Sequence, residues 1–231
     1  IRAAGDITLR GGATVRGDAV VPPGYNVDVG GGSEVTGEVR YEEVRSVSVT
    51  NAVYERCGEL QESNDNAGTG AINGSRLDSS RSSWSLSEGS YFISGDLVVE
   101  SGEELRFDNS AGDIELCVGG DVDIRGGSVV VGDGGSGAGR VDVFQRGDAF
   151  SVTGGGEVVV PGDDSSVLWF YGDDGVDVTV RGSRVVGVIS MPAGEDGDGS
   201  ALVQSGGEVF GAVISGPIEM RSGGRVHYDQ S

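Results

Sequence analysis

A short repeating unit runs through most of this sequence: an alternating apolar strand pattern ends in a pair of small residues, after which another strand pattern begins. The copies stand at residues 7–12, 27–32, 122–127, 150–155, 178–183, 202–207 and 218–223. Strict apolar/polar alternation buries one face of a strand. Glycine accepts the positive φ angles that tight corners need. The unit therefore predicts many short strands joined by tight corners.

The spacing of these corners favours one all-β architecture. In the C-terminal half, successive glycine corners lie 17 to 28 residues apart, which suits one coil of a solenoid. The rival is a β-sandwich, which predicts hairpin signals such as Asn-Gly between neighbouring strands. The chain has one Asn-Gly, at Asn73-Gly74, outside the strand-rich regions. We expect a parallel β-solenoid (β-helix), right-handed by the general rule for parallel crossovers.

One segment interrupts the repeat. Residues 42–90 contain a possible short helix over residues 50–60, a polar stretch and a Ser/Arg-rich run. We interpret this segment as an insertion or a linker. The predicted organisation is N-terminal solenoid coils over 1–41, an insertion over 42–90 and the main solenoid over 91–231.

The excess of acidic over basic residues indicates the salt conditions in which the protein works. The chain has 37 acidic and 16 basic residues, a formal charge of −21, and every basic residue is arginine. An acidic surface without lysine is typical of adaptation to molar salt, where screening suppresses self-repulsion. The alternative is an acidic secreted protein from an ordinary habitat. The balance argues against nucleic-acid binding, which needs a basic face.

Two cysteines and one sequon are candidate modification sites. Cys57 lies in the insertion and Cys117 in an apolar run of the main solenoid, so a disulfide would pin the insertion to the β body. The alternative for Cys117 is a buried free thiol. Asn73-Gly74-Ser75 is a possible N-glycosylation sequon.

The apolar runs are too short for a membrane helix. The chain opens inside a strand pattern without an initiator Met, so we expect a mature or excised product. The expected location is extracellular, at the cell surface.

Acidic side chains offer candidates for chemistry, but the composition weakens each of them. Asp163-Asp164 and Asp173-Asp174 resemble the carboxylate pairs of polysaccharide-cleaving enzymes, yet solvated loop charge is the simpler interpretation in so acidic a chain. Glu195, Asp196 and Asp198 could bind calcium on a glycine-rich loop, although the EF-hand spacing is missing. We assign no catalytic residues, no other cofactor and no enzymatic activity.

Residues from 91 onward resemble a known family at several points. The matching segments are residues 91–97, 114–122, 185–192, 206–214 and 225–229, the last reading Arg-Val-His-Tyr-Asp. They are similar to the β-solenoid domain of type IV pilus-associated and cell-surface proteins of bacteria and haloarchaea. The first 40 residues more weakly resemble bactofilin-type repeats, which polymerise end to end. The resemblance implies a cell-surface, pilus-linked or adhesive role and carries no catalytic residues.

The ends of a solenoid add a hypothesis about assembly. An uncapped end presents unpaired strand edges, which recruit other chains. Residues 1–9 and 218–228 both look strand-forming, so we expect the termini to be open ends that stack between copies or pair with other pilus subunits. The alternative is that residues upstream of Ile1 cap the N-terminal end. The leading hypothesis is a structural subunit or decoration of a surface filament. The alternatives are a glycan-binding adhesin and a carboxylate-dependent polysaccharide enzyme.

Overall fold

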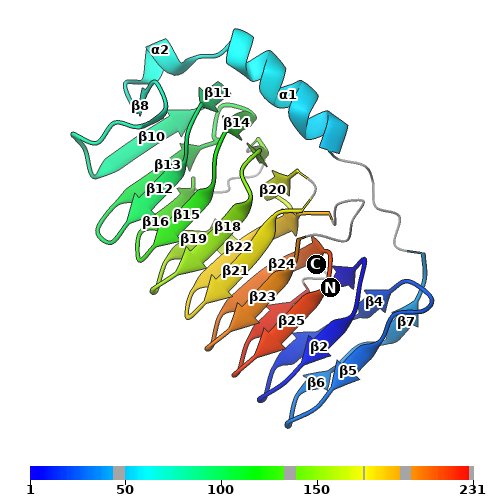
Figure 1. The fold of residues 1–231 in the computed structure, drawn as a ribbon. Coiled ribbons are helices and arrows are strands. Elements are labelled where there is room, and N and C mark those ends of the chain that lie inside the picture. The colour runs from blue at the N-terminus through cyan, green and yellow to red at the C-terminus, as the bar shows by residue number, and fades with distance from the viewer. Residues whose placement is uncertain (44–49, 133–138, 174, 193–198, 229–231) are drawn as a thin grey trace.

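The chain forms a right-handed parallel β-solenoid built from stacked coils (Figure 1). The structure is a computed structural model, and it describes residues 1–43, 50–132, 139–173, 175–192 and 199–228. Within those ranges, the single antiparallel pair of strands is a small hairpin outside the solenoid wall. The fold class predicted from the repeating unit is confirmed, and the β-sandwich is excluded because its sheets are antiparallel.

Two sheets make up the wall. An eight-stranded sheet forms one face. In spatial order its strands are β12 (Leu97–Glu100), β15 (Val122–Arg125), β18 (Ala149–Thr153), β21 (Asp177–Arg181), β23 (Ala201–Gln204), β25 (Ile218–Arg221), β2 (Ile7–Leu9) and β5 (Val27–Val29).

A sixteen-stranded sheet folds around the rest of the solenoid. One strip of it holds β10 (Ser83–Ser87), β13 (Glu104–Asp108), β16 (Ser128–Val131), β19 (Glu157–Val159), β26 (Arg225–His227), β3 (Thr14–Arg16) and β6 (Glu34–Val35). The other strip holds β11 (Gly89–Ile93), β14 (Ile114–Val118), β17 (Val141–Gln145), β20 (Leu168–Gly172), β1 (Arg2–Ala3), β4 (Ala19–Val21) and β7 (Val39–Tyr41). The short 3-10 turn η1 (Pro161–Asp163) follows β19.

Two long strands join these strips. β22 (Arg184–Ser190) pairs with β19 through its first half and with β20 through its second half. β24 (Glu208–Ser215) runs beside it in parallel register. Both strands turn the corner at glycines with positive φ, 148° at Gly187 and 134° at Gly211. The chain therefore passes this corner without a loop.

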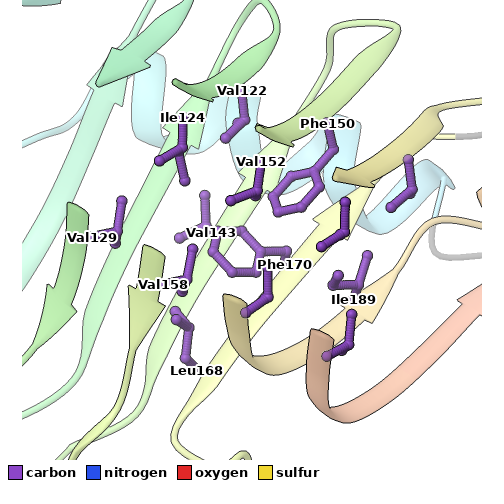
Figure 2. Packing of buried hydrophobic residues seen from close by; sticks show 14 of the residues in the cluster. Val122, Ile124, Val129, Val143, Phe150, Val152, Val158, Leu168, Phe170 and Ile189 are labelled. Carbon is purple, nitrogen blue, oxygen red and sulfur yellow. The ribbon is translucent and has the colours of Figure 1, made fainter. Parts of the chain in front are cut away.

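The inward-facing side chains form one continuous apolar core along the solenoid axis. Phe150 of β18 packs on Phe170 of β20 with ring centroids 4.8 Å apart, and Figure 2 shows the two rings among aliphatic side chains from the surrounding strands. Val143, Val152 and Leu168 in this layer are fully buried. Each such side chain contributes about 1.5–3 kcal/mol of burial free energy, so this core is the main source of stability.

The solenoid is continuous in space but not in sequence. Ile7 of β2 lies opposite Ile218 on one side and opposite Val27 on the other. β1 likewise lies between β24 and β4. The first three strands therefore pair with the last three inside the wall, β1 with β24, β2 with β25 and β3 with β26, as the blue and red strands of Figure 1 show. The expectation that the chain termini form the open ends is wrong, because the strand pattern does not reveal which strands become neighbours.

The insertion connects the two parts of the solenoid. α1 (Thr50–Glu62) lies on the outside against β11, β14, β17 and β20 (Figure 1). It is followed by α2 (Asn66–Thr69), β8 (Ile72–Asn73) and β9 (Arg76–Leu77). The helix extends slightly beyond the predicted 50–60. The wall resumes with β10 inside the range assigned to the insertion, because Trp84 and Leu86 alternate with serines and point into the core.

Candidate functional site

The two ends of the solenoid differ in whether their interior side chains are covered. At the end formed by β10, β11 and β12, Trp84 and Leu86 are buried. Ala71, Ile72 and Leu77 belong to the same core cluster and are themselves buried. These three residues come from the segment that contains α2 and the β8–β9 hairpin. That segment therefore closes this end of the core.

Hydrogen bonds fasten this cap to the outer edge of the first coil. The Asn66 side-chain amide donates to the Phe92 carbonyl (2.6 Å), and the Phe92 backbone N–H donates to the Asn66 Oδ1 (3.1 Å). The Gly95 N–H donates to the Ser75 carbonyl (3.1 Å). Backbone groups that would otherwise be free on this edge are thus paired, which blunts it against strand addition.

The opposite end, which we call the open coil, consists of β5, β6 and β7 over residues 27–41. Val29, Val39 and Tyr41 lie in register with interior residues of the preceding coil, yet they are 42%, 41% and 58% exposed. Their register partners, all fully buried, are Leu9, Ala19 and Val21. The apolar stack that fills the solenoid therefore reaches the surface here, and Tyr25, 45% exposed, lies close by in sequence.

The strand edges of the open coil are also unpaired. Among the described residues, β5 pairs with β2 alone, β6 with β3 alone and β7 with β4 alone. Each strand therefore has a second edge of backbone donors and acceptors without a strand partner. A buried unpaired backbone group costs about 1–3 kcal/mol, so these edges stay in water or pair with another strand.

Charged side chains surround the open coil. Arg40 forms ion pairs with Asp18 (3.1 Å) and Glu38 (3.0 Å). Arg10 forms an ion pair with Asp28, and this contact holds the pKa of the Asp28 carboxyl below its usual value. All three pairs are largely solvent-exposed, so each contributes little to stability. The open coil thus has an apolar centre and a charged rim, which is the anatomy of a protein interface.

A disulfide between Cys57 and Cys117 fixes α1 to the solenoid, with the two Cα atoms 5.3 Å apart. Both cysteines are fully buried in a small second core with Val53 and Leu60 of the helix. Of the alternatives that the sequence left open, the structure has the bridge rather than a free thiol.

The remaining predicted sites stay predictions. Asn73 is exposed at the end of β8, in the hairpin turn, where its side chain is accessible to glycosylation. Glu195, Asp196 and Asp198 lie outside the described residues. Across the described ranges, no group of three or more His, Cys, Asp or Glu side chains could hold a metal ion.

The candidate catalytic carboxylates are engaged in local contacts. Asp163 accepts two hydrogen bonds from Arg184 (2.8 and 2.9 Å). Asp164 accepts hydrogen bonds from the backbone and the hydroxyl of Ser166 (3.0 and 2.6 Å). Asp174 lies outside the described residues. These contacts fix the loop after β19, which is the structural role expected of acidic loop residues.

One family model matches most of this sequence. It is described as a domain of unknown function, DUF7305, and it matches residues 34–231. The chain belongs to the DUF7305 family. In this DUF7305 chain, the matched range begins at the first residue of β6, within the open coil. A search of curated proteins finds no match. In the described part of the chain, no helix is long and apolar enough to cross a membrane.

Two solved structures have a similar course of the chain. An ice-binding protein from an Antarctic biological consortium is 12% identical with a TM-score of 0.51, covering 97% of this chain and 86% of that one. An ice-binding protein from an Arctic yeast is 14% identical with a TM-score of 0.41, covering 99% and 92%. At this identity the first similarity supports the architecture alone.

Proposed function

We propose that this chain is an extracellular structural protein that joins a second copy of itself, end to end, through the open coil. The exposure of Val29, Val39 and Tyr41 carries the proposal. These residues continue a buried apolar stack, and another β layer placed on them would remove them from water. The same layer would pair the free edges of β5, β6 and β7.

A second copy suits this surface because the open coil is complementary to itself. A two-fold axis perpendicular to the solenoid axis would place two open coils face to face with antiparallel strands. Each unpaired strand edge would then form the alternating backbone hydrogen bonds of an antiparallel pair with the second copy. The apolar centres would meet, while the charged rims would stay at the circumference.

The cap limits how far such an assembly grows. Head-to-tail polymerisation by coil stacking needs two open ends, and the cap occupies one of them. We therefore propose a pair as the unit rather than a bare homopolymer of stacked solenoids. Such pairs would form or decorate a surface filament or pilus, the role implied by the family resemblance of residues 91–229.

The extracellular setting and the salt adaptation are parts of the same proposal. The Cys57–Cys117 disulfide supports an oxidising compartment. A formal charge of −21 with arginine as the only basic residue type supports a high-salt habitat. Two chains of this charge repel each other at low ionic strength, and molar salt shortens the Debye length to about 3 Å. Pairing is therefore expected to strengthen as salt is added.

The similar Antarctic structure is named as an ice-binding protein. We do not propose ice binding for this chain. The flat eight-stranded face carries surface ion pairs, namely Arg10–Asp28, Arg125–Asp123 and Arg221–Glu219. At 12% identity the similarity to the Antarctic protein shows the fold alone.

Sedimentation analysis of the purified chain tests the proposal. In about 2 M NaCl, where charge repulsion is screened, the wild type is expected to sediment as a dimer. Val39→Lys puts an ammonium group into the apolar centre and is expected to give a folded monomer. Val130→Lys, at a half-buried position on the outer wall in β16, is the matched control and is expected to stay dimeric. A wild type that is monomeric at every salt and protein concentration contradicts the proposal, and so does a Val39→Lys variant that still pairs.

A further inference from the structure

A groove of about 600 Å³ lies on the outer wall where the N-terminal coils meet the C-terminal ones. Its volume is in the range of small-ligand sites, about 300–1,000 Å³. Asp18, Val20 and Arg40 line it from the N-terminal side of the junction, while Trp169 and Ile214 line it from the C-terminal side. The groove therefore exists only when both parts of the solenoid are assembled.

The groove owes its depth to the corner that β22 and β24 turn without a loop. Gly211 is part of the groove, and a Cβ on Gly211 would lie 2.8 Å from the Cβ of Ser165. The loop before β20 contributes Ser165 on one side, and Tyr228, just after β26, contributes to the other. The corners of β22 and β24 thus form a depression between the loop before β20 and the segment just after β26.

The floor of the groove is apolar and the rim is aromatic. Val188 of β22, Ile214 of β24 and Val20 of β4 lie on the outward side of the wall and form the floor, with β1 running between β24 and β4. Trp169 stands at the rim, where its indole N–H donates to the Ser166 carbonyl (2.9 Å). Tyr171 stacks on its ring with centroids 5.7 Å apart, and the Arg140 guanidinium lies 4.7 Å from its centroid; neither residue lines the groove, so these contacts hold the ring in place from outside it. Tyr228 is 52% exposed, and its backbone N–H donates to the Arg16 carbonyl (2.9 Å).

The charged groups of the groove include an arginine without an ion pair among the described residues. Arg40 is paired with Asp18 and Glu38, so its charge is compensated. Arg2 is exposed on β1 between Ile214 and Val20, and it takes part in none of the ion pairs found within the described ranges. A free guanidinium beside an apolar floor is notable in a chain of net charge −21. It is a ready partner for a ligand carboxylate or sulfate.

We propose that this groove binds an acidic saccharide, such as a uronic-acid-containing segment of a surface glycan. The C–H faces of sugar rings pack on aromatic side chains, which Trp169 and Tyr228 supply. Sugar hydroxyls donate to carboxylate and hydroxyl oxygens, which Asp164 and Ser165 supply. Arg2 binds the uronate carboxylate. The proposal adds a ligand site to the structural role and does not depend on pairing through the open coil.

Binding across the junction has a consequence for stability. A saccharide that contacts Arg2 on one side and Trp169 on the other holds the N-terminal coils to the C-terminal coils. A ligand bound to the folded state alone raises the apparent stability by mass action. Trigalacturonate at concentrations above its dissociation constant is therefore expected to raise the melting temperature.

Titration calorimetry with trigalacturonate tests the site directly, with galactotriose as the neutral probe and triglutamate as an acidic peptide probe. We expect trigalacturonate to bind at least tenfold more tightly than either of the other two. Arg2→Gln is expected to weaken its binding about tenfold or more and to bring it to the level of galactotriose. Trp169→Ala is expected to weaken both saccharides. Arg181→Gln and Tyr54→Ala, whose side chains lie outside the groove, are the matched controls and keep wild-type affinity.

Three results would overturn the proposal. One is the absence of binding of either saccharide to a folded wild type at millimolar concentration. Another is tighter binding of triglutamate than of trigalacturonate, which would indicate a peptide site. The third is equal loss of affinity in Arg2→Gln and in its control Arg181→Gln, which would indicate nonspecific attraction. Because Trp169→Ala removes a loop contact, its folding is checked by comparing its circular dichroism spectrum with that of the wild type. If Trp169→Ala does not fold, the test rests on the result for Arg2→Gln.

Discussion

Gly211 shows how single residues decide whether the wall can close. Its φ of 134° lies outside the range that side-chain-bearing residues adopt readily, and an added Cβ would enter the van der Waals radius of the Gly187 carbonyl oxygen. Gly58 differs because it lies inside α1 with nothing near its missing side chain. The two glycines thus have opposite expected responses to the same substitution.

Gly211→Ala is expected to destabilise the fold by about 2–3 kcal/mol, through backbone strain and the clash with the neighbouring coil. Gly58→Ala is expected to stabilise it by about 0.5–1 kcal/mol, because alanine is the better helix former. Urea unfolding of the two variants measures both effects. Equal responses of the two variants would contradict the backbone geometry assigned to Gly211.

His227 gives the chain a pH response in the neutral range. Its ring stacks on Phe210 with centroids 4.5 Å apart, and its Nε2 is buried without a hydrogen-bond partner among the described residues. Burial, with Arg16 adding to it, lowers the pKa of His227 below the ordinary 6.5. Protonation therefore favours the unfolded chain, and stability falls as the pH drops through the unfolded value.

The free energy of unfolding is expected to decrease between about pH 7.5 and pH 5.5 in the wild type. His227→Phe keeps an aromatic ring on Phe210 and removes the titrating group, so its stability should change less over this range. Comparing the two proteins isolates the contribution of His227 from that of other groups. An identical pH dependence in both would show that His227 has no part in it.

Among the elements, α1 with its disulfide ties the solenoid together along its outer wall. Arg56 of the helix donates from Nε to Glu115 of β14 (2.9 Å), next to the bridge between Cys57 and Cys117. The bridge closes a loop with a sequence separation of 60, which includes the cap. Constraining a loop of this length in the unfolded chain stabilises the folded state by about 4 kcal/mol at most.

Replacing both cysteines by alanine is expected to lower the free energy of unfolding by about 2–4 kcal/mol while the solenoid core stays intact. Urea unfolding monitored by circular dichroism gives the value, and oxidised wild type is the reference. Reduced wild type should match the double variant. If the double variant were as stable as the oxidised protein, α1 would be held by its apolar contacts alone.

The strands were predictable from sequence because each unit carries its own alternation and its own glycines. The pattern at residues 178–183 corresponds to β21 and its following turn, and the predicted helix at 50–60 corresponds to α1. The partners of each strand were not predictable, since Ile7 has the same local pattern whether it ends the wall or lies between Val27 and Ile218. Asn73-Gly74 was placed outside the strand-rich regions, whereas it stands in the β8–β9 hairpin, whose position as a cap depends on where the solenoid starts.

The candidate site depends on the same missing information. Val29 and Val39 alternate with polar residues as buried strand residues do elsewhere in the chain. Val29 and Val39 are exposed only because no described segment lies on the open coil. That exposure depends on the order in which the coils stack, which the local sequence does not contain. Sequence reasoning therefore predicted that an end would be open but placed the open ends at the wrong residues.

For the whole molecule, the charge of −21 sets how stability responds to salt. Repulsion among the carboxylates opposes folding most at low ionic strength, where the Debye length is about 10 Å at 0.1 M. The surface arginine–carboxylate pairs weaken with salt, but each contributes about 1 kcal/mol or less. We therefore expect the melting temperature to rise between about 0.1 and 1 M NaCl, with KCl giving the same curve. A fall over this range would show that the ion pairs outweigh the repulsion.

The central claim is that one end of the solenoid is closed and the other pairs with a second copy. Electron microscopy of the purified protein at high salt shows both ends of each particle at once. The account predicts elongated particles made of two solenoids, joined at their open coils, with a cap at each outer tip. Single solenoids at every concentration, or chains of more than two solenoids stacked in line, would contradict it.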